Sequence, residues 1–275
     1  MADPGTPYDF LEQPVALARI LMAKKRAPDY FDVTLTKIVD FGNETRHFEL
    51  NFDPGKRMRF MAGQFVVVIC PKEGKVIRRA YSIASEPEKQ DRVELVVKLV
   101  QGGAVTNWFW SLKEGDRFKV QAPFGKFVLP EPIDFDLVFA ATGTGIAPFR
   151  SMIRHLLPAG FCAEARGGAS SGAGRQRRIW LLFGSRFEKM IPYEEEWLEL
   201  ARRYSHFTYL PTLSRPGPDW KGETGYVQTK IAKFFSDPAG KRVYICGLNE
   251  MIQAVQEACL AQGFTKGQIA YEKYD

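Results

Sequence analysis

The hydrophobic pattern of this chain changes once, near Glu131, and this change limits the folds available to it. Residues 32–128 contain short alternating runs such as FDVTLTKIV, which Gly, Pro and Asn interrupt roughly every ten residues. After LPEPIDF, continuous apolar runs such as DLVFAAT alternate with amphipathic runs such as NEMIQAVQEACLAQG. The first pattern is typical of an antiparallel barrel or sandwich, and the second of a parallel sheet covered by helices on both faces.

We therefore predict an N-terminal extension over residues 1–30, a barrel domain over 31–131 and an α/β domain over 132–275. The segment AVTNWFWSLKEGD interrupts the barrel as a predicted helix. Residues 11–26 have the pattern of an amphipathic basic helix, for which a packed extension is the default and contact with a membrane or partner the alternative. Residues 160–178 are rich in Gly, Ser, Ala and Arg, which predicts a mobile loop.

Composition excludes several classes of function. Lys and Arg total 38 against 32 acidic residues, and the net charge of +6 favours an anionic ligand or an acidic partner. No dense basic run with interleaved aromatic residues is present, so nucleic acid is not a predicted partner. The four cysteines are too far apart for a predicted metal or iron–sulfur site, and the three histidines occur in unrelated contexts.

The chain has no apolar stretch of the roughly 18 residues needed to span a bilayer. Its first residues, MADPGTPYDFLEQP, lack the basic start of a secretory signal. We expect a cytoplasmic, unexported protein without membrane association.

The segment DLVFAATGTGIAPFRSM predicts a turn that binds phosphate. A buried strand is followed by Gly143 and Gly145, and then by Pro148 in an amphipathic helix. Glycines let the backbone approach a ligand closely, and the N–H groups at a helix start attract a pyrophosphate. The order of strand, turn and helix therefore predicts dinucleotide binding.

A second candidate turn follows the barrel strand RVELVVKLV. Gly102 and Gly103 leave backbone donors uncovered, and the hydroxyl of Thr106 supplies another donor. The alternative is a capped helix after a hairpin. The nearby segment KVIRRAYSIAS places two arginines in a strand-like run, which predicts an anion close to them.

Six motifs occur here in an order that resembles the ferredoxin:NADP reductase family. They are RAYS at 79–82, the segment from Gly102 to Thr106, APFGKF, the Gly143 turn with Pro148, Cys246-Gly247 and the terminal YEKYD. The resemblance extends from residue 32 onward. It implies a six-stranded antiparallel β-barrel that binds FAD, followed by a Rossmann-like domain with a five-stranded parallel sheet that binds the pyridine nucleotide.

The resemblance also implies roles for the residues that bind FAD. Arg79, with Ala80 beside it, binds the FAD phosphates, while the ring of Tyr81 packs on the isoalloxazine and Ser82 hydrogen-bonds toward flavin N5. Gly102, Gly103 and Thr106 close on the pyrophosphate. Without the resemblance, Tyr81 and Ser82 are a strand aromatic residue and a surface serine.

At the chain end, the resemblance places Tyr274 over the other flavin face, Glu272 nearby, and Cys246 with Gly247 beside the nicotinamide. Ser82, Cys246, Glu272 and Tyr274 are therefore the predicted catalytic residues, which shape and polarise the contact without a covalent nucleophile. Without the resemblance, Cys246 is a buried thiol and Tyr274 a frayed tail. The chain departs from the family pattern because Asp275 follows the tyrosine.

The predicted nucleotide site combines the first turn with two polar segments. The turn contributes Gly143, Thr144, Gly145 and Pro148. The segments contribute Ser185, Arg186, Ser214, Arg215, Tyr226 and Gln228. Arginine and hydroxyl donors suit a ribose 2′-phosphate, whereas an acidic residue suits the diol of NAD. The segment with Ser214, Arg215, Tyr226 and Gln228 resembles the family's 2′-phosphate and adenine site. The resemblance implies that Arg215 binds the 2′-phosphate and that Tyr226 stacks on adenine, which favours NADPH over NADH.

Together these features predict an FAD-dependent reductase that moves electrons reversibly between NADP(H) and an acidic carrier, ferredoxin or flavodoxin. No Cys-x4-Cys-x2-Cys segment occurs within the chain, so we expect electrons to leave to a separate carrier. Lys72, Lys75 and Arg78 are candidate docking charges, with a simply solvated cluster as the alternative. The alternative function is an NADH-dependent reductase component for an oxygenase or iron–sulfur partner.

Overall fold

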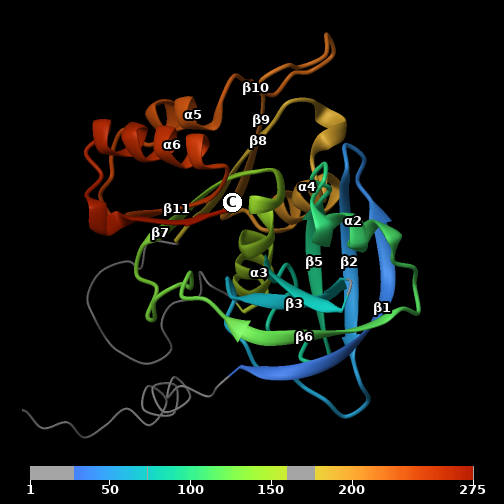
Figure 1. The fold of residues 1–275 in the computed structure, drawn as a ribbon. Helices are drawn as coiled ribbons and strands as arrows, with labels where there is room; N and C mark the ends of the chain where they lie inside the picture. Colours follow the sequence, from blue (N-terminus) through green and yellow to red (C-terminus); the bar gives the residue numbers. More distant parts are fainter. Residues whose placement is uncertain (1–27, 73, 160–176, 275) are drawn as a thin grey trace, which may run out of the picture.

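The computed structural model describes residues 28–72, 74–159 and 177–274 (Figure 1). The predicted helix over 11–26 therefore lies outside the described residues, as do Asp275 and nearly all of the predicted loop over 160–178.

The first domain is an antiparallel sheet that curls into a barrel. Its six strands among the described residues are β1 (Asp29–Asp40), β2 (Thr45–Phe52), β3 (Phe65–Lys72), β4 (Lys75–Ser82), β5 (Arg92–Lys98) and β6 (Arg117–Phe124). Their order is β4-β3-β6-β1-β2-β5. The end strands meet where Ile83 forms a bridge with Leu95 and the Ala84 N–H donates to the Glu94 carbonyl over 2.8 Å. The predicted six-stranded antiparallel barrel is confirmed.

Alternating apolar side chains fill the barrel. Phe48 and Leu50 of β2 are fully buried, as the alternation of the sequence predicts. The helical insert is α2 (Ala104–Ser111), and its Phe109 enters the same core with ring centroids 4.9 Å from Phe48. The insert predicted to be helical is thus a helix that covers the barrel interior.

The second domain is a parallel sheet with helices between its strands. Its strands are β7 (Asp136–Thr142), β8 (Ile179–Ser185), β9 (Phe207–Leu213), β10 (Glu223–Thr224), β11 (Lys241–Gly247) and β12 (Ile269–Lys273). All neighbours in the order β10-β9-β8-β7-β11-β12 are parallel. The sheet has six strands among the described residues and not the predicted five, because β10 is two polar residues long and carries no hydrophobic pattern.

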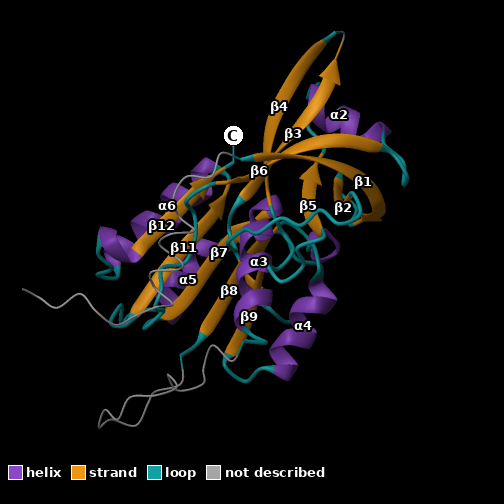
Figure 2. Ribbon diagram, turned by 90° about the horizontal axis from the view of Figure 1, so that it is seen from below, coloured by secondary structure: helices purple, strands orange, loops and turns teal. Residues whose placement is uncertain are grey.

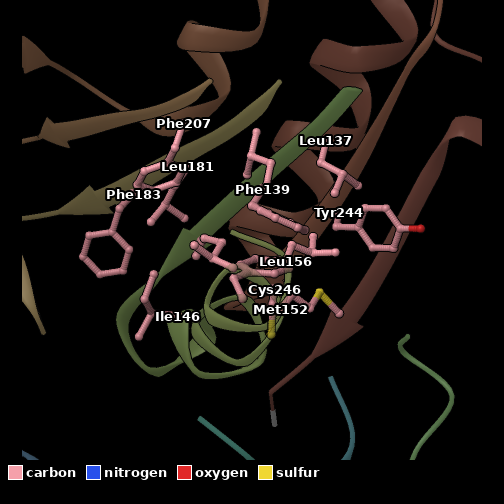
Figure 3. Close-up of a cluster of buried hydrophobic side chains, with 14 of the residues drawn as sticks. Leu137, Phe139, Ile146, Met152, Leu156, Leu181, Phe183, Phe207, Tyr244 and Cys246 are labelled. Carbon is pink, nitrogen blue, oxygen red and sulfur yellow. The ribbon is translucent and has the colours of Figure 1, made fainter. Parts of the chain in front are cut away.

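Helices cover both faces of this sheet (Figure 1). They are α3 (Ile146–Leu156) and α4 (Glu194–Arg203) on one face, and α5 (Val227–Phe234) and α6 (Asn249–Ala261) on the other; short 3₁₀ turns are η1 (Gly143–Gly145), η2 (Glu188–Met190) and η3 (Lys266–Gln268). Leu137 and Phe139 of β7 pack with α3 (Figure 3), whereas Val138 and Ala140 pack with α5 and α6. The predicted Rossmann-like architecture is confirmed.

The two domains share a packed boundary. In the view from below, α3 lies between the parallel sheet and the barrel strands (Figure 2). Ala147 in the first turn of α3 packs against Ala84 and Val96 of the barrel domain. Within the described residues, no helix has the length and apolar character needed to cross a bilayer.

Candidate active site

The end of β4 meets the last strand of the parallel sheet. Ser82 ends β4 and is 6% exposed, and its hydroxyl donates a 3.2 Å hydrogen bond to Glu272 of β12. Cys246 of β11 is paired in register with Glu272, so the two side chains lie on adjacent strands. A barrel residue and two residues from the edge of the parallel sheet therefore meet at the domain boundary.

Burial raises the pKa values of the acidic side chains in this cluster. Burial raises the pKa of the Cys246 thiol well above its usual range, and the charge of Glu272 raises it further. Burial also raises the pKa of the Glu272 carboxyl, while the hydrogen bond from Ser82 opposes that shift. The Tyr274 hydroxyl is buried beside Ser82 and Cys246, and burial raises its pKa strongly. The thiol is therefore neutral at physiological pH, which does not suit a thiolate nucleophile.

The structure thus brings together the four residues predicted to be catalytic: Ser82, Cys246, Glu272 and Tyr274. They come from the end of β4, the end of β11 and the last strand. Ligands of open parallel sheets bind at the carboxyl ends of the strands, which is where this cluster lies.

Strand β4 carries several of the residues predicted to bind FAD. Arg79 and Ala80 are exposed, and the Arg79 guanidinium donates to the Arg78 carbonyl over 2.9 Å. Among the residues the structure describes, Arg79 forms no ion pair. Tyr81 is half-buried, with its ring edge-on to Phe109 at 5.2 Å. A free guanidinium beside a braced aromatic ring is an arrangement that suits a phosphate attached to a flat heterocycle.

The second glycine turn leads into α2. Gly102 has φ +73° with open space around the position of a Cβ. A Cβ on Gly103 would lie 2.7 Å from Oγ1 of Thr106, so a larger residue there would displace the threonine hydroxyl. The Thr106 hydroxyl itself lies within hydrogen-bonding distance of the backbone of Val100 and Gly103. Thr106 therefore braces the turn from within, and its predicted contact with a phosphate would compete with these bonds.

The first glycine turn packs directly against the Cys246 strand. Gly143 of η1 has φ +54°, and a Cβ on Gly145 would lie 2.2 Å from the Cys246 carbonyl oxygen. Thr144 is half-buried, and Pro148 is buried in the first turn of α3. The predicted pyrophosphate turn and the predicted nicotinamide residue are therefore in contact through backbone alone.

The two polar segments of the predicted nucleotide site lie side by side. The N–H groups of Ser214 and Arg215 donate to the carbonyls of Ser185 and Arg186, each over 2.9 Å. Both arginines are exposed, and neither forms an ion pair within the described part of the chain. The backbone pairing thus places two exposed arginines next to each other at the ends of β8 and β9.

The predicted adenine residues lie beside these arginines. The Gly225 N–H donates to the Leu213 carbonyl over 2.8 Å, which brings the following residue, Tyr226, next to the end of β9. Tyr226 is 64% exposed, and Gln228 is half-buried in the first turn of α5. An exposed ring of this kind offers a stacking surface for a base.

Two features of this region were not apparent from the sequence. The Thr142 hydroxyl at the end of β7 is buried and has no hydrogen-bond partner among the described residues, and a Cβ on Gly247 would lie 2.6 Å from it. Arg150 of α3 is buried and contacts the barrel domain. The only sequence signal for either was proximity to the Gly143 turn, within an apolar strand and an amphipathic helix.

These observations fit FAD and a pyridine nucleotide. The exposed guanidinium of Arg79 suits phosphates, and the ring of Tyr81 suits a flavin. Gly145 and Gly247 pack too closely on Cys246 and Thr142 to carry a side chain, whereas the position of a Cβ on the exposed Gly143 is open. The donors paired at Arg186 and Arg215 suit a second phosphate group.

Comparison with known proteins identifies an FAD-binding and an NAD-binding domain in the chain. A family profile described as "Oxidoreductase FAD-binding domain" matches residues 32–129, and one described as "Oxidoreductase NAD-binding domain" matches residues 139–257. "Ferredoxin--NADP reductase B" of Sorangium cellulosum is 37% identical over 236 residues, which are 82% of this chain and 91% of that protein. The "Phenol 2-monooxygenase, reductase component DmpP" of a Pseudomonas species is 33% identical over 92% of this chain, which spans 64% of that relative's length.

Solved structures show the same fold. The Amycolatopsis cytochrome P450 reductase GcoB has a TM-score of 0.78 at 26% identity, over 90% of this chain and 71% of that one. A ferredoxin NADP+ reductase from Neisseria gonorrhoeae, solved with bound FAD and NADP, has a TM-score of 0.73 at 22% identity, over 89% of this chain and 98% of that one.

The fold, the site and these matches define an oxidoreductase that binds FAD in its barrel domain and a nicotinamide nucleotide in its α/β domain. The chain belongs to the ferredoxin–NADP reductase family.

Proposed function

We propose that this reductase transfers electrons reversibly between NADP(H) and an acidic one-electron carrier, ferredoxin or flavodoxin. The observation that carries the proposal is the meeting of Ser82, Cys246 and Glu272 at the boundary of the two domains. When bound, FAD supplies hydride exchange with the nicotinamide and release of single electrons. We assign residues 31–131 to the FAD domain and 132–275 to the nucleotide domain.

The residues of this chain bind and orient the reactants. Arg79 and the Gly102 turn hold the FAD phosphates, and the rings of Tyr81 and Tyr274 border the flavin. The Ser82 hydroxyl holds the Glu272 carboxyl in place by its hydrogen bond, and burial raises the pKa of that carboxyl above its usual range. Most of the rate enhancement then comes from positioning and not from covalent chemistry.

NADP(H) is the proposed nucleotide because Arg186 and Arg215 lie side by side without an acidic partner among the described residues. Two exposed guanidinium groups bind a 2′-phosphate well, whereas the ribose diol of NAD prefers a carboxylate. The name of the Sorangium relative, a ferredoxin–NADP reductase, supports the same assignment.

The proposed docking surface for the carrier consists of Lys72, Lys75 and Arg78. Lys72 and Lys75 are paired at the tip of the β3–β4 hairpin, and all three side chains are exposed. Arg78 directly precedes Arg79 on β4, so a carrier bound there would lie near the proposed FAD site. Charges in this position favour fast encounter with an acidic protein.

A second candidate is an NADH-dependent reductase component for an oxygenase. The similarity to a phenol 2-monooxygenase reductase component over nearly the whole chain favours it. The two candidates share the flavin site and differ in nucleotide and electron acceptor.

The test begins with the absorbance spectrum of the purified protein, in which bound flavin is expected. Anaerobic flavin reduction is then measured with NADPH and with NADH, and cytochrome c reduction with and without added ferredoxin or flavodoxin. Preference for NADPH and stimulation by a carrier support the proposal. Preference for NADH without such stimulation favours the oxygenase component, and failure to bind flavin contradicts both.

A further inference from the structure

A buried arginine, Arg150, connects the two domains through contacts that include none of the predicted site residues. Arg150 lies on α3 and is 5% exposed. Its Nη1 donates to the Ala84 carbonyl over 3.0 Å and to the carboxylate of Glu94, both in the barrel domain. Its Nε and Nη2 donate to Glu196 of α4 over 3.0 and 2.9 Å. All three guanidinium nitrogens are therefore used, and they join one helix to two segments of the other domain.

A tyrosine extends this contact to another barrel strand. The Tyr193 ring lies 4.2 Å below the Arg150 guanidinium, and its hydroxyl is 2.8 Å from Nδ1 of His47 on β2. Tyr193 has φ +59°, a left-handed conformation that costs a bulky residue free energy and persists only where the surroundings hold it. We call this group the Arg150 junction. It contains Arg150, Tyr193 and Glu196 of the second domain with His47, Ala84 and Glu94 of the first.

The ion pair between Arg150 and Glu94 gives the junction both a fixed geometry and a buried charge. Burial disfavours ionisation of Glu94, but Arg150 more than offsets this and lowers the pKa of the carboxyl to about 2. The ion pair is therefore formed at all physiological pH values. A planar guanidinium with fixed donors holds its partners in a single geometry, which an apolar contact of the same size does not.

The junction attaches to both halves of the site through short, stiff pieces of backbone. Arg150 lies on α3, five residues after the N-cap residue Gly145, and Gly145 packs against the Cys246 strand. Ala84 follows Ser82 by two residues, and Ser82 binds Glu272. A shift of α3 relative to Ala84 would therefore move the nucleotide turn relative to the end of β4.

We propose that Arg150 is a positioning residue for hydride transfer, which keeps the nucleotide-binding turn in register with the flavin-binding strand by anchoring α3 to Ala84 and Glu94. The inference rests on the proposed placement of the flavin at Ser82 and the nucleotide at Gly145. Arg150 touches neither group and acts through the helix that carries it.

The first variant to test is Arg150→Lys, which keeps the charge but lacks the planar set of donors. Two half-reactions are measured with the FAD-loaded protein: flavin reduction by NADPH in a single turnover, and reoxidation of dithionite-reduced flavin by ferricyanide. Flavin reduction is expected to fall at least about tenfold, since a misplacement near 1 Å costs up to about 100-fold, whereas reoxidation stays within about twofold. The affinity for ADP-ribose, which binds one domain only, is expected to be unchanged.

A second measurement does not depend on activity. In the flavin-free protein, hydrogen–deuterium exchange of residues 83–96 and of α3 is expected to accelerate in Arg150→Lys. The control is Arg202→Gln, at an exposed arginine of α4 outside the Arg150 junction. Its effect on flavin reduction is expected to be less than about fivefold.

The double variant Arg150→Met with Glu94→Gln serves if Arg150→Lys does not fold, because it removes both buried charges together. It should show the same selective loss of flavin reduction. Wild-type flavin reduction in both folded variants would overturn the inference, as would an equal loss of both half-reactions in proportion to the folded fraction. If the wild-type flavin is reduced by neither nucleotide, the proposed function fails, while the exchange measurement still tests whether Arg150 anchors α3.

Discussion

The Ser82 hydroxyl donates a 3.2 Å hydrogen bond to the Glu272 carboxylate, and this bond joins residues 190 positions apart in the chain. Ser82 ends strand β4 of the barrel, and Glu272 lies on β12, the final strand of the parallel sheet. The bond therefore connects the two domains at the candidate active site. It also holds a carboxyl whose pKa is raised by burial next to the thiol of Cys246.

Glu272→Gln is expected to slow flavin reduction by NADPH by about tenfold while FAD stays bound, because the amide keeps the bond to Ser82 but cannot ionise or exchange a proton. Single-turnover absorbance at the flavin band measures the rate. Glu257→Gln on the exposed face of α6 is the matched control and should leave the rate unchanged. An unchanged rate in Glu272→Gln would remove this carboxyl from the site.

Arg215→Ala is expected to lower kcat/KM for NADPH by about 10- to 100-fold, the effect of losing a charge-assisted hydrogen bond. The value for NADH should stay the same, since NADH has no 2′-phosphate. Steady-state kinetics with both nucleotides provide the measurement, and Arg202→Ala on the exposed end of α4 is the control. Equal losses with both nucleotides would show that Arg215 does not bind the 2′-phosphate.

The sequence predicted the features of this protein that depend on local pattern. The run from Leu137 to Leu156 contains a strand, a glycine turn and a helix because both the apolar run and Gly143 with Gly145 lie within it. The barrel followed from alternation with period two. The short strand β10 could not be predicted, since two polar residues that pair only with the end of β9 carry no pattern.

Contacts between distant parts of the chain could rarely be predicted from the sequence. Ser82 and Glu272 were grouped only through resemblance to a family, and nothing in either local segment indicates the other. Arg150 was missed entirely, because an arginine on an amphipathic helix normally belongs to the solvated face. His47 was treated as an isolated histidine, and the structure places it against Tyr193 across the domain boundary. Each of these contacts requires the fold before it can be recognised.

Gly145→Ala is expected to lower the free energy of unfolding by about 2–3 kcal/mol and to abolish nucleotide binding. The added methyl group would lie 2.2 Å from the Cys246 carbonyl oxygen, and neither backbone can move without disturbing η1. Urea unfolding and nucleotide titration measure the two effects. Gly267→Ala, where the nearest atom lies at 3.9 Å, is the control and should change stability by less than about 0.5 kcal/mol. Normal nucleotide affinity in Gly145→Ala would contradict the assigned turn.

The double variant Lys75→Glu with Arg78→Glu is expected to raise the KM for an acidic carrier about tenfold at low ionic strength and to leave flavin reduction by NADPH unchanged. The difference should shrink as salt is added, because exposed charges are screened. Lys266→Glu, at an exposed position on η3 of the second domain, is the control. Identical carrier kinetics in the variant and the wild type would show that the carrier docks elsewhere.

His47 makes the stability of the domain boundary depend on pH. Burial lowers its pKa from 6.5 to about 4, with Glu94 opposing the shift and Arg150 reinforcing it. As pH falls, the unfolded chain therefore takes up this proton before the folded protein does. The lowered pKa of His47 therefore contributes about 3 kcal/mol to the free energy of unfolding above about pH 6.5. This contribution is lost as the pH falls toward 4.

His47→Gln removes this titration but keeps a side chain that can form a hydrogen bond with the Tyr193 hydroxyl. Urea midpoints measured at pH 7 and pH 5 should differ less in this variant than in the wild type, because one group that favours the unfolded state on acidification is gone. His155→Gln, at a more exposed histidine paired with Glu88, should keep the full wild-type difference. If both variants follow the wild type, His47 takes up its proton as easily in the folded protein as in the unfolded chain, and the boundary is more open to water than its burial implies.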